Sequence, residues 1–382
     1  MGPVTRCARG GLAALALLCG LRAAAAQQTT PPPQELGEIV VSAGDPVSEL
    51  TATTRRVTAA DIEAYGARTL DEAIGLLPGV YVRSGGDGVP RIDLRGFRTR
   101  QVTLLLDGVP LNATSDGQFD PSFIPVEEIA EIKLTSGTAS VLYGSGGLAG
   151  AINIVTRTGE GRPNATGRGE WRDSDGWLGR LTGSGAGGPV TVFVAASGTS
   201  IGGLPSVDGS PTLGAVGSRQ RLNSDRERLN LSGRFGLALS PSAAAGLTLQ
   251  TVNGEYGTPP SVIDDPADPF ANRPVYERVT DLDGLAAQLG GSYVPAAEWS
   301  VRGWVYRNLL NQLTDRFADA GFDPVTVLTE VGTSRDRSRS LLTGVALQVS
   351  TTAFPIGRVT VGLTADRSRW EESLLEAVAP PG

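Results

Sequence analysis

Two residue types that carry much of protein chemistry are nearly missing from this chain of 382 residues. Histidine is absent, and the only cysteines, Cys7 and Cys19, lie close to the N-terminus. The rest of the chain therefore has no thiolate nucleophile, no thiolate zinc site and no histidine base for a serine hydrolase. Carboxylate chemistry and hard-cation binding remain open, but no pair of acidic residues stands out from ordinary surface positions. We therefore expect the protein not to be an enzyme and to hold no cofactor.

The balance of charge argues against nucleic acid as a partner. Positive charge comes almost entirely from arginine, because Lys133 is the only lysine, yet the formal net charge is -7. A basic footprint for phosphate backbones is therefore absent. Glycine is abundant at 51 residues and charged residues make up only 19%. This composition favours many short strands and turns over long charged helices.

The first 26 residues have the composition of a secretory signal. Arg6 and Arg9 precede an apolar run from Leu12 to Leu21, and alanines at 24–26 provide a small-residue cleavage site. The apolar run is shorter than the roughly 20 residues that a membrane-spanning helix needs, so a signal anchor is the weaker interpretation. We expect the mature chain to begin near Gln27 and to be exported.

Residues 27–49 form a leader between the signal and the first domain. Positions 27–36, QQTTPPPQEL, are polar and proline-rich, which predicts an extended and mobile chain. A short β-prone run follows at Glu38–Ala43. This run is either an edge strand offered to a partner or the first strand of the next domain, and the pattern alone leaves both interpretations open.

Residues 50–157 have the mixed pattern of a small α+β domain. Two short helices are expected, because capping signatures occur at Thr58–Asp61 and Thr69–Glu72, and Pro78-Gly79 ends the second helix. If short links make successive strands alternate in direction, the loops at 84–90 and 108–124 emerge at the same end. Strands are expected near 80–83, 91–96, 102–106, 131–134 and 151–157.

Residues 158–382 lack helix signals and alternate between polar and apolar residues. From the third expected strand onward, short links rich in small residues alternate with long polar links such as 255–277 and 309–335. This asymmetry is typical of outer-membrane barrels, and a soluble β-sandwich is the alternative. Four aromatic residues near one turn, Tyr293, Trp299, Trp304 and Tyr306, suit either an interfacial girdle or a packed core. Nine strands are expected near 165–173, 176–187, 190–199, 228–239, 243–254, 278–293, 298–308, 336–350 and 357–369.

Several strings within residues 37–157 occur in the order and spacing of one family. Beside the run Glu38–Ala43, they are Leu77-Pro78-Gly79-Val80, Ile92-Asp93-Leu94-Arg95-Gly96-Phe97, Leu106-Asp107-Gly108-Val109-Pro110, Ile124-Pro125-Val126-Glu127-Glu128-Ile129, Tyr143-Gly144 and Gly150-Ala151-Ile152-Asn153-Ile154. With these strings the chain resembles the TonB-dependent outer-membrane receptors. The resemblance is dense from 37 to 157 and continues only as a strand pattern from 158 to 382.

The glycines between 144 and 150 also imitate a dinucleotide-binding loop. Such a loop must follow a strand and open a helix, whereas a β-branched strand follows here. We therefore interpret these glycines as residues that let a strand pack closely against its neighbours.

The resemblance implies an α+β plug domain at 50–157, followed by antiparallel transmembrane β-barrel strands at 158–382 that supply part of a barrel of about 22 strands. It implies import of a scarce chelate, with a ferric siderophore as the first candidate and cobalamin as the alternative. It also implies contact with outer-membrane lipid and a partner, TonB with its ExbB–ExbD energising complex, which binds the leader by strand addition. The residues of this TonB box are Glu38, Ile39, Val40, Val41, Ser42 and Ala43.

The resemblance places a ligand site on the plug loops that face outward. Arginines there would pair with anionic chelates, and a phenyl ring would pack on an apolar ligand face. Each residue, taken singly, is also explained as part of a solvated loop. The candidates are Arg83, Asp87, Arg91, Asn112, Asp116, Gln118 and Phe119.

A weaker site is implied at one acidic loop. Asp264, Asp265 and Asp268 lie within five residues, and cobalamin receptors, which the chain also resembles, often bind calcium through such carboxylates. We prefer the interpretation that this loop is acidic for solubility, and we expect no other metal site.

The length of the chain departs from the family. A barrel of about 22 strands at this spacing would need roughly 500 residues after the plug, whereas 158–382 holds 225. An unclosed barrel leaves unpaired backbone groups in lipid, and a barrel of eight to ten strands is too narrow to contain a plug. We therefore expect a partial or truncated receptor with about nine barrel strands, and a non-functional fragment is the alternative to a transporter.

Overall fold

The computed structural model describes residues 52–84, 89–111, 119–137, 149–172, 176–203, 220–260, 275–355 and 357–378. All of them belong to one contact unit. The predicted signal, the run Glu38–Ala43 and the acidic loop with Asp264 lie outside the described residues. None of the described helices is long and apolar enough to cross a bilayer.

The first helix, α2 (Ala59–Tyr65), begins with the predicted capping box. The backbone N–H of Asp61 donates to Oγ1 of Thr58 over 3.3 Å, and the backbone N–H of Thr58 donates to Oδ2 of Asp61 over 2.8 Å. The helix ends at Gly66, whose φ of 78° lies in the left-handed region that glycine adopts without strain. Local sequence chemistry therefore fixes both ends of α2.

The second helix, α3 (Leu70–Ile74), lacks the predicted cap, because the side chain of Thr69 makes no capping hydrogen bond. Thr69 pairs instead in a β-bridge with Pro125, so the helix is positioned by a tertiary contact. The Glu72 carboxylate accepts from the backbone N–H of Arg68 over 2.7 Å. The helix ends at Ile74, earlier than the predicted end at Pro78-Gly79.

The described residues from Ala52 to Thr156, which we call the small domain, contain two sheets. The strand order of the first is β1-β6-β7-β4-β5, and β4 runs parallel to β7 while the other pairs are antiparallel. A separate hairpin of β2 and β3 forms the second. The expected single alternation of strand direction is therefore wrong. The strands are β1 (Ala52–Thr58), β2 (Val80–Ser84), β3 (Pro90–Leu94), β4 (Val102–Leu106), β5 (Val109–Pro110), β6 (Ile129–Gly137) and β7 (Gly150–Thr156), with 3-10 turns at Thr99–Gln101, Pro121–Phe123 and Val126–Glu128.

Strand β1 is the element of the small domain that the sequence pattern missed. It pairs with β6 from Ala52 to Thr58, although its run of threonines and arginines carries little apolar signal.

The core of the small domain is made of aliphatic side chains from the helices and both sheets. Its largest fully buried members are Leu70, Ile74, Leu77, Ile92, Leu94, Leu104, Leu105, Ile129, Ile132, Leu134, Ile152 and Ile154.

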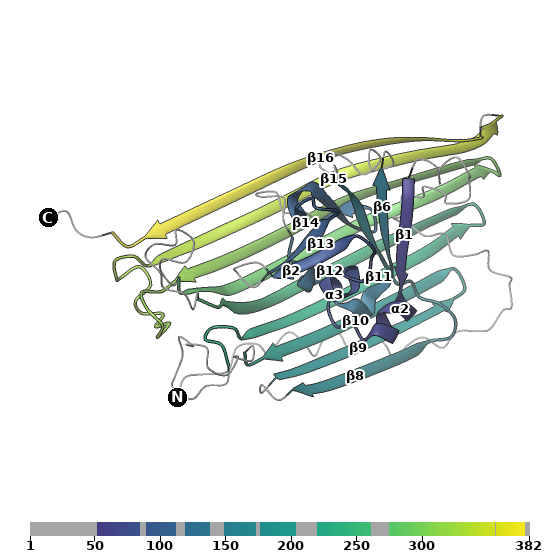
Figure 1. Cartoon of the computed structure of the whole chain (residues 1–382). Helices are drawn as coiled ribbons and strands as arrows, with labels where there is room; N and C mark the ends of the chain where they lie inside the picture. Colours follow the sequence, from purple (N-terminus) through teal and green to yellow (C-terminus); the bar gives the residue numbers. More distant parts are fainter. Residues whose placement is uncertain are drawn as a thin grey trace. The chain divides into compact units, whose positions relative to one another are not determined.

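The nine strands after the small domain form one antiparallel sheet in chain order, the large sheet (Figure 1). All nine lie in a single sheet, so the sandwich alternative is excluded. Each strand pairs with its successor in the sequence. The strands are β8 (Asn164–Arg172), β9 (Gly176–Gly187), β10 (Val190–Ile201), β11 (Arg226–Ser240), β12 (Ala243–Thr258), β13 (Glu277–Ala296), β14 (Trp299–Arg316), β15 (Ser334–Phe354) and β16 (Gly357–Glu376).

The later strands are longer than the sequence pattern predicts. Strand β14 extends to Arg316, so the expected long link at 309–335 begins eight residues too early. The extension is polar, yet it stays paired on both sides, with Leu313 opposite both Asp281 and Arg337. Backbone pairing, which the alternation of hydropathy does not report, sets the ends of these strands.

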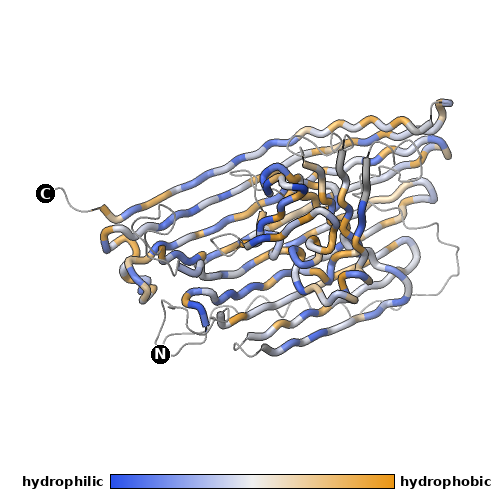
Figure 2. The backbone as a smooth tube through the Cα atoms, in the orientation of Figure 1, coloured by the Kyte–Doolittle hydropathy of each residue, from blue (hydrophilic) through white to orange (hydrophobic). Residues whose placement is uncertain are grey.

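The two faces of the large sheet differ in chemistry, as the alternating colours along each strand show in Figure 2. We call the face that contacts the small domain the inner face and the opposite one the outer face. Of the four aromatic residues near one turn, the two with odd numbers lie on the outer face and the two with even numbers lie on the inner face. Tyr293 and Trp299 are 51% and 38% exposed, whereas Trp304 and Tyr306 are 5% and 3% exposed. Core packing is therefore confirmed for Trp304 and Tyr306, and an interfacial position stays a prediction for Tyr293 and Trp299.

Candidate functional site

Three arginines of the large sheet reach the small domain from the inner face. They are Arg180 on β9 and Arg228 and Arg234 on β11, and all three are buried. Each one meets a carboxylate of the small domain. Buried charges of this kind must be paired and hydrogen-bonded to be tolerated. The small domain is therefore fixed against the sheet by ion pairs as well as by apolar packing.

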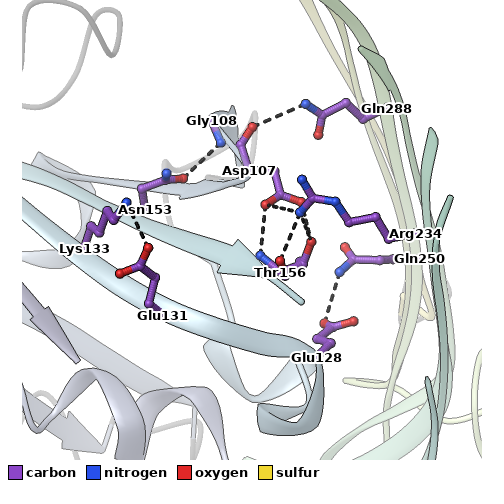
Figure 3. A network of polar contacts seen from close by, with 10 residues as sticks. All are labelled: Asp107, Gly108, Glu128, Glu131, Lys133, Asn153, Thr156, Arg234, Gln250 and Gln288. Carbon is purple, nitrogen blue, oxygen red and sulfur yellow. Dashed lines mark hydrogen bonds and ion pairs between the residues drawn. The ribbon is translucent and has the colours of Figure 1, made fainter. Parts of the chain in front are cut away.

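The pair of Arg234 and Asp107 is the most fully satisfied of these contacts (Figure 3). One guanidinium nitrogen of Arg234 lies 3.1 Å from Oδ1 of Asp107 and donates to Oγ1 and to the carbonyl oxygen of Thr156 over 2.6 and 3.0 Å. The hydroxyl of Thr156 donates to Oδ2 of Asp107 over 2.6 Å. The carboxylate thus has partners from both the sheet and the small domain.

A tight turn between β4 and β5 presents Asp107 to the sheet. Asp107 and Gly108 have φ values of 48° and 82°, which suits the Asp-Gly type of two-residue hairpin turn. The N–H of Gly108 donates to Oδ1 of Asn153 over 3.0 Å, and Gln288 of β13 donates to the carbonyl oxygen of Asp107 over 3.3 Å. The motif Leu106–Pro110 therefore serves as the contact between hairpin and sheet.

The second arginine, Arg228, holds the turn Pro121–Phe123. It donates to the carbonyl oxygen of Ser122 over 2.6 Å, and its guanidinium carbon lies 4.6 Å from the ring centre of Phe123. A guanidinium nitrogen of Arg228 lies 3.8 Å from Oδ2 of Asp120.

The third arginine, Arg180, pairs with Glu127 and donates to the carbonyl oxygen of Arg68 over 2.7 Å.

Sequence reasoning missed these arginines because it treated the strands only as a pattern of alternation. The available signal was parity: Arg228 and Arg234 occupy inner positions among the alternating residues of β11, where the outer positions are Leu229, Leu231 and Phe235. An arginine on the inner face of a strand needs a carboxylate partner, and the small domain is the nearest source.

Glu128 is a buried acid beside these pairs. It is 2% exposed, and its Oε1 accepts from Nε2 of Gln250 over 3.0 Å. Among the described residues, its Oε2 has no hydrogen-bond partner. Burial raises the pKa of Glu128 from 4.5 to about 7, and the hydrogen bond from Gln250 offsets only part of that effect.

A cavity of about 430 Å³ lies between the small domain and strands β11 to β16. On the sheet side, its lining comes from the middle of the strands and from the ends next to the long links, for example Tyr256, Gln312 and Asp336. The lining from the small domain is Val89, Arg91, Pro110, Leu111, Phe119, Asp120, Phe123, Ile124, Pro125 and Glu128.

The cavity combines aromatic rings with carboxylates and amides. Phe119 and Phe123 meet edge to face, with ring centres 5.9 Å apart and planes at 81°, and Trp370 belongs to the opposite wall. Asp336 and Glu372 add acidic groups from β15 and β16. Such a surface suits a bulky ligand with apolar faces and hydrogen-bond donors. Within the described parts of the chain, no group of three or more His, Cys, Asp or Glu residues is placed to hold a metal ion.

Two of the seven predicted ligand residues, Arg91 and Phe119, line this cavity. Arg83 is not among its lining residues, and its Nε donates to Oδ2 of Asp93 over 2.8 Å. Both predicted loops contribute to one cavity, since Val89 and Leu111 line it together. The remaining candidates, Asp87, Asn112, Asp116 and Gln118, lie outside the described residues, as do the six residues of the predicted TonB box and Asp264, Asp265 and Asp268.

Comparison with known proteins supports the arrangement. Residues 46–151 match the model of the TonB-dependent receptor plug domain. The chain is 36% identical over 146 residues to the vitamin B12 transporter BtuB of Photobacterium profundum, which covers 37% of this chain and 23% of the relative. It is 35% identical over 127 residues to BtuB of Vibrio vulnificus, covering 32% of this chain and 21% of that relative.

Solved receptors share the fold at low sequence identity. The unliganded ferric citrate transporter FecA matches with a TM-score of 0.65 at 18% identity, over 85% of this chain and 49% of its own. The copper transporter OprC matches with 0.65 at 14% identity, over 84% and 47%. The pyoverdine receptor FpvA of Pseudomonas aeruginosa matches with 0.62 at 14% identity, over 85% and 43%. The matches therefore span less than half the length of these proteins. The expected fold class, an α+β domain followed by part of an antiparallel barrel, is confirmed.

Proposed function

We propose that this chain belongs to a TonB-dependent receptor and serves the energy-coupled import of a scarce metal chelate across an outer membrane. The observation that carries the proposal is the small domain held against the inner face of the sheet by Arg180, Arg228 and Arg234. A plug fixed in this way would close the pore of a complete barrel, so passage of a ligand would require work on the plug.

The ligand would bind in the cavity between the plug and the strands. The rings of Phe119 and Phe123 would pack on an apolar face of the chelate, and Arg91 would pair with an anionic group. The long links lie at the ends of the strands that this cavity approaches, so we assign that end to the outside of the cell. Arg83, Asp87, Asn112, Asp116 and Gln118 stay as proposed ligand residues without an observed contact in the cavity.

Coupling would act through the leader. TonB would pair with Glu38–Ala43 by strand addition, in which main-chain hydrogen bonds supply the affinity. The pull must disturb the buried ion pairs of the plug before the ligand can pass. Export through a cleaved signal at 1–26, a leader at 27–49, a plug at 50–157 and barrel strands from 158 onward remain part of this proposal.

A ferric siderophore is the first candidate ligand, because Arg91 offers a cation to an anionic chelate. Cobalamin is the second candidate, and the observation that favours it is the 36% identity with a vitamin B12 transporter over 146 residues. Competition for binding between ferric siderophores and cobalamin separates the two. The calcium site at Asp264, Asp265 and Asp268 belongs to the cobalamin alternative, and calcium removal would weaken binding only there.

The substitution Val40→Pro tests the proposal in the full-length receptor. Proline removes a main-chain donor from the TonB box, so uptake of the radiolabelled ligand should stop while binding to whole cells stays unchanged. Gln34→Pro, in the proline-rich leader before the box, is the matched control and should leave uptake intact. Normal uptake by Val40→Pro would refute the coupling role of the box.

The length of the native product decides between a transporter and a non-functional fragment. The chain of 382 residues has a mass of 39.5 kDa. An intact mass well above this value, measured on isolated outer membranes, would identify the front of a complete importer. A mass equal to residues 27–382 would remove the basis for transport by this chain alone.

A further inference from the structure

The cavity between the small domain and strands β11 to β16 is lined by more acidic than basic side chains. Within the described parts of the chain, its lining contains four carboxyl groups and one guanidinium. The guanidinium belongs to Arg91, which already interacts with another residue of the chain. The carboxyl groups belong to Asp120, Glu128, Asp336 and Glu372. This excess of acidic groups favours a ligand with positive charge over an anionic one.

Two of the four acids are compensated from within the chain. Asp120 lies 3.8 Å from a guanidinium nitrogen of Arg228. Glu128 is partly protonated at neutral pH, because burial raises its pKa to about 7. The negative charge that a ligand would meet therefore comes from the sheet, where Asp336 lies on β15 and Glu372 lies on β16.

Asp336 and Glu372 lie close together on the inner face. Ser338 lies opposite Glu372, and Asp336 is the next residue along β15 on the same face. The two carboxylates are close enough to interact electrostatically. Among the described residues, neither forms an ion pair with a basic residue, and Arg335 of the opposite face is held by Asp315. The two acids therefore present uncompensated negative charge to the cavity.

The inner positions of six strands form one row that runs the length of the cavity. The register places Asn230 of β11 at one end of this row and Trp370 of β16 at the other. Neighbouring strands lie about 4.8 Å apart, so the row spans roughly 24 Å along the sheet. With a volume of about 430 Å³, the cavity suits an elongated ligand better than a compact one. The row consists of Asn230, Val252, Gly284, Leu310, Ser340 and Trp370, and all six residues line the cavity.

At the β11 end, two buried side chains have oxygen atoms without a partner. Asn230 is 8% exposed and Glu128 is 2% exposed. Among the described residues, Oδ1 of Asn230 and Oε2 of Glu128 have no hydrogen-bond partner. The other polar atom of each side chain is occupied, since Asn230 donates to Ser197 and Glu128 accepts from Gln250 (Figure 3). Buried acceptors without a partner are costly, so this end of the cavity needs a hydrogen-bond donor from outside the chain.

At the β16 end, an aromatic ring adjoins the two acids of the sheet. Trp370 and Glu372 are two residues apart on one strand, so their side chains lie on the same face. Among the described residues, Oδ1 of Asp336 is buried without a hydrogen-bond partner. Carboxylates next to a tryptophan ring bind organic ammonium groups through charge, hydrogen bonds and cation–π attraction. This end of the cavity therefore suits a protonated amine.

We propose that the chelate bound in this cavity is elongated and carries a protonated amine. The ammonium group would bind between Asp336 and Glu372, next to the ring of Trp370. Amide N–H groups farther along the chelate would donate to Asn230 and Glu128. The inference rests on the proposed function, because it takes this cavity as the site from which the chelate is imported. It narrows the ferric siderophores to those with a cationic end.

Two iron chelates that differ by one charge test the inference. Ferrioxamine B is a linear iron(III) trihydroxamate with a terminal ammonium group, and its N-acetyl derivative lacks that charge. In calorimetric titration of the purified protein, ferrioxamine B should bind at least about tenfold tighter than the derivative, because only ferrioxamine B makes charge-assisted hydrogen bonds to the two acids. Ferric citrate, which is anionic, should bind more weakly than either.

Removal of the two acids should abolish this preference. Asp336→Asn/Glu372→Gln should bind ferrioxamine B as weakly as the wild type binds the N-acetyl derivative. The matched control is Glu227→Gln/Glu371→Gln, which removes two carboxylates from exposed positions outside the cavity lining and should keep the preference. If the first variant does not fold, Trp370→Leu should reduce the preference about fivefold through loss of the cation–π contact.

Equal affinity of the wild type for ferrioxamine B and its N-acetyl derivative would overturn the inference, and so would tighter binding of ferric citrate. Import of a chelate would still stand in both cases. Val40→Pro should keep the preference for ferrioxamine B in binding and lose its uptake, so a failure of coupling gives a different result. Binding of cyanocobalamin alone would overturn the inference and leave cobalamin as the imported ligand. If none of these chelates binds, both the inference and the proposed import are wrong.

Discussion

Arg234 on β11 and Asp107 on the turn after β4 form a buried ion pair of 3.1 Å between residues 127 positions apart. Their side chains are 9% and 2% exposed. Thr156 contacts both partners, so the hairpin turn, the last strand of the small domain and the large sheet meet at one point. The plug therefore cannot leave the sheet without exposing or separating this pair.

Breaking this pair from one side should destabilise the plug strongly. Asp107→Asn leaves the buried guanidinium of Arg234 without its counter-charge, and such changes cost about 3–5 kcal/mol. Thermal unfolding of the purified protein measures the loss. The double variant Asp107→Asn/Arg234→Met should lose less than the sum of the two single variants, because the second change removes the unpaired charge.

A surface pair is the control for this experiment. Arg168 lies 3.2 Å from Glu170, and its side chain is 64% exposed. Arg168→Gln should cost less than about 1 kcal/mol. An equally small loss for Asp107→Asn would mean that the buried pair does not hold the plug.

The stability of the plug should depend on pH through Glu128. The folded protein keeps this proton up to about pH 7, whereas an ordinary glutamate releases it near 4.5. The folded state therefore binds more protons than the unfolded state between these values, and the free energy of unfolding falls as pH rises through this window. The melting temperature of the wild type should decline from about pH 4.5 to about 7. Above about pH 7, Glu128 should contribute no further change.

Glu128→Gln isolates that contribution. Glutamine keeps the size and a hydrogen-bond acceptor for Gln250 but does not titrate. Relative to this variant, the wild type should lose up to roughly 3 kcal/mol between the two ends of the window. If the free energy of unfolding depends on pH in the same way for both proteins, folding does not raise the pKa of Glu128 and this prediction is wrong.

Much of this fold can be predicted from the sequence, because local chemistry decides it. The capping box of Thr58 and Asp61 forms as expected, and β9 begins and ends where alternation predicts. Strand β1 and the polar end of β14 were missed, since pairing with neighbours determines them and their side chains carry little apolar signal. The cap expected at Thr69 failed because a tertiary bridge holds that residue.

The candidate site is less predictable from sequence than the fold. The expectation that two plug loops share one end placed Arg91 and Phe119 at the cavity. The same expectation included Arg83, whose contact with Asp93 depends on a diagonal neighbour across the β2–β3 hairpin. Parity along β11 could have identified Arg228 and Arg234 as inward residues, but their partners and the burial of Glu128 depend on how the small domain packs on the sheet, which sequence alone does not provide.

The ligand residues should therefore differ in their effects. Phe119→Ala removes a ring from the cavity wall and Arg91→Ala removes its cation, so each should weaken ligand binding about tenfold or more. Arg83→Ala should have a smaller effect, because that guanidinium is held by Asp93. Titration of the purified protein with ferric siderophores and with cobalamin measures all three. A loss with Arg83→Ala as large as that with Phe119→Ala would assign Arg83 to the site after all.

Gly344 should not tolerate a side chain, because the ring of Tyr306 occupies the space beside it on the inner face. It lies opposite Tyr306, and a Cβ at this position would collide with the tyrosine ring and its hydroxyl. Tyr306 is buried, so the ring cannot move without disturbing its neighbours. Gly344→Ala should destabilise the protein by about 1–3 kcal/mol, as overpacking does elsewhere. Gly187→Ala, where a Cβ meets nothing within 4 Å, should have little effect. In a Tyr306→Ala background, Gly344→Ala should cost almost nothing further, and a persisting loss there would exclude the ring as the cause.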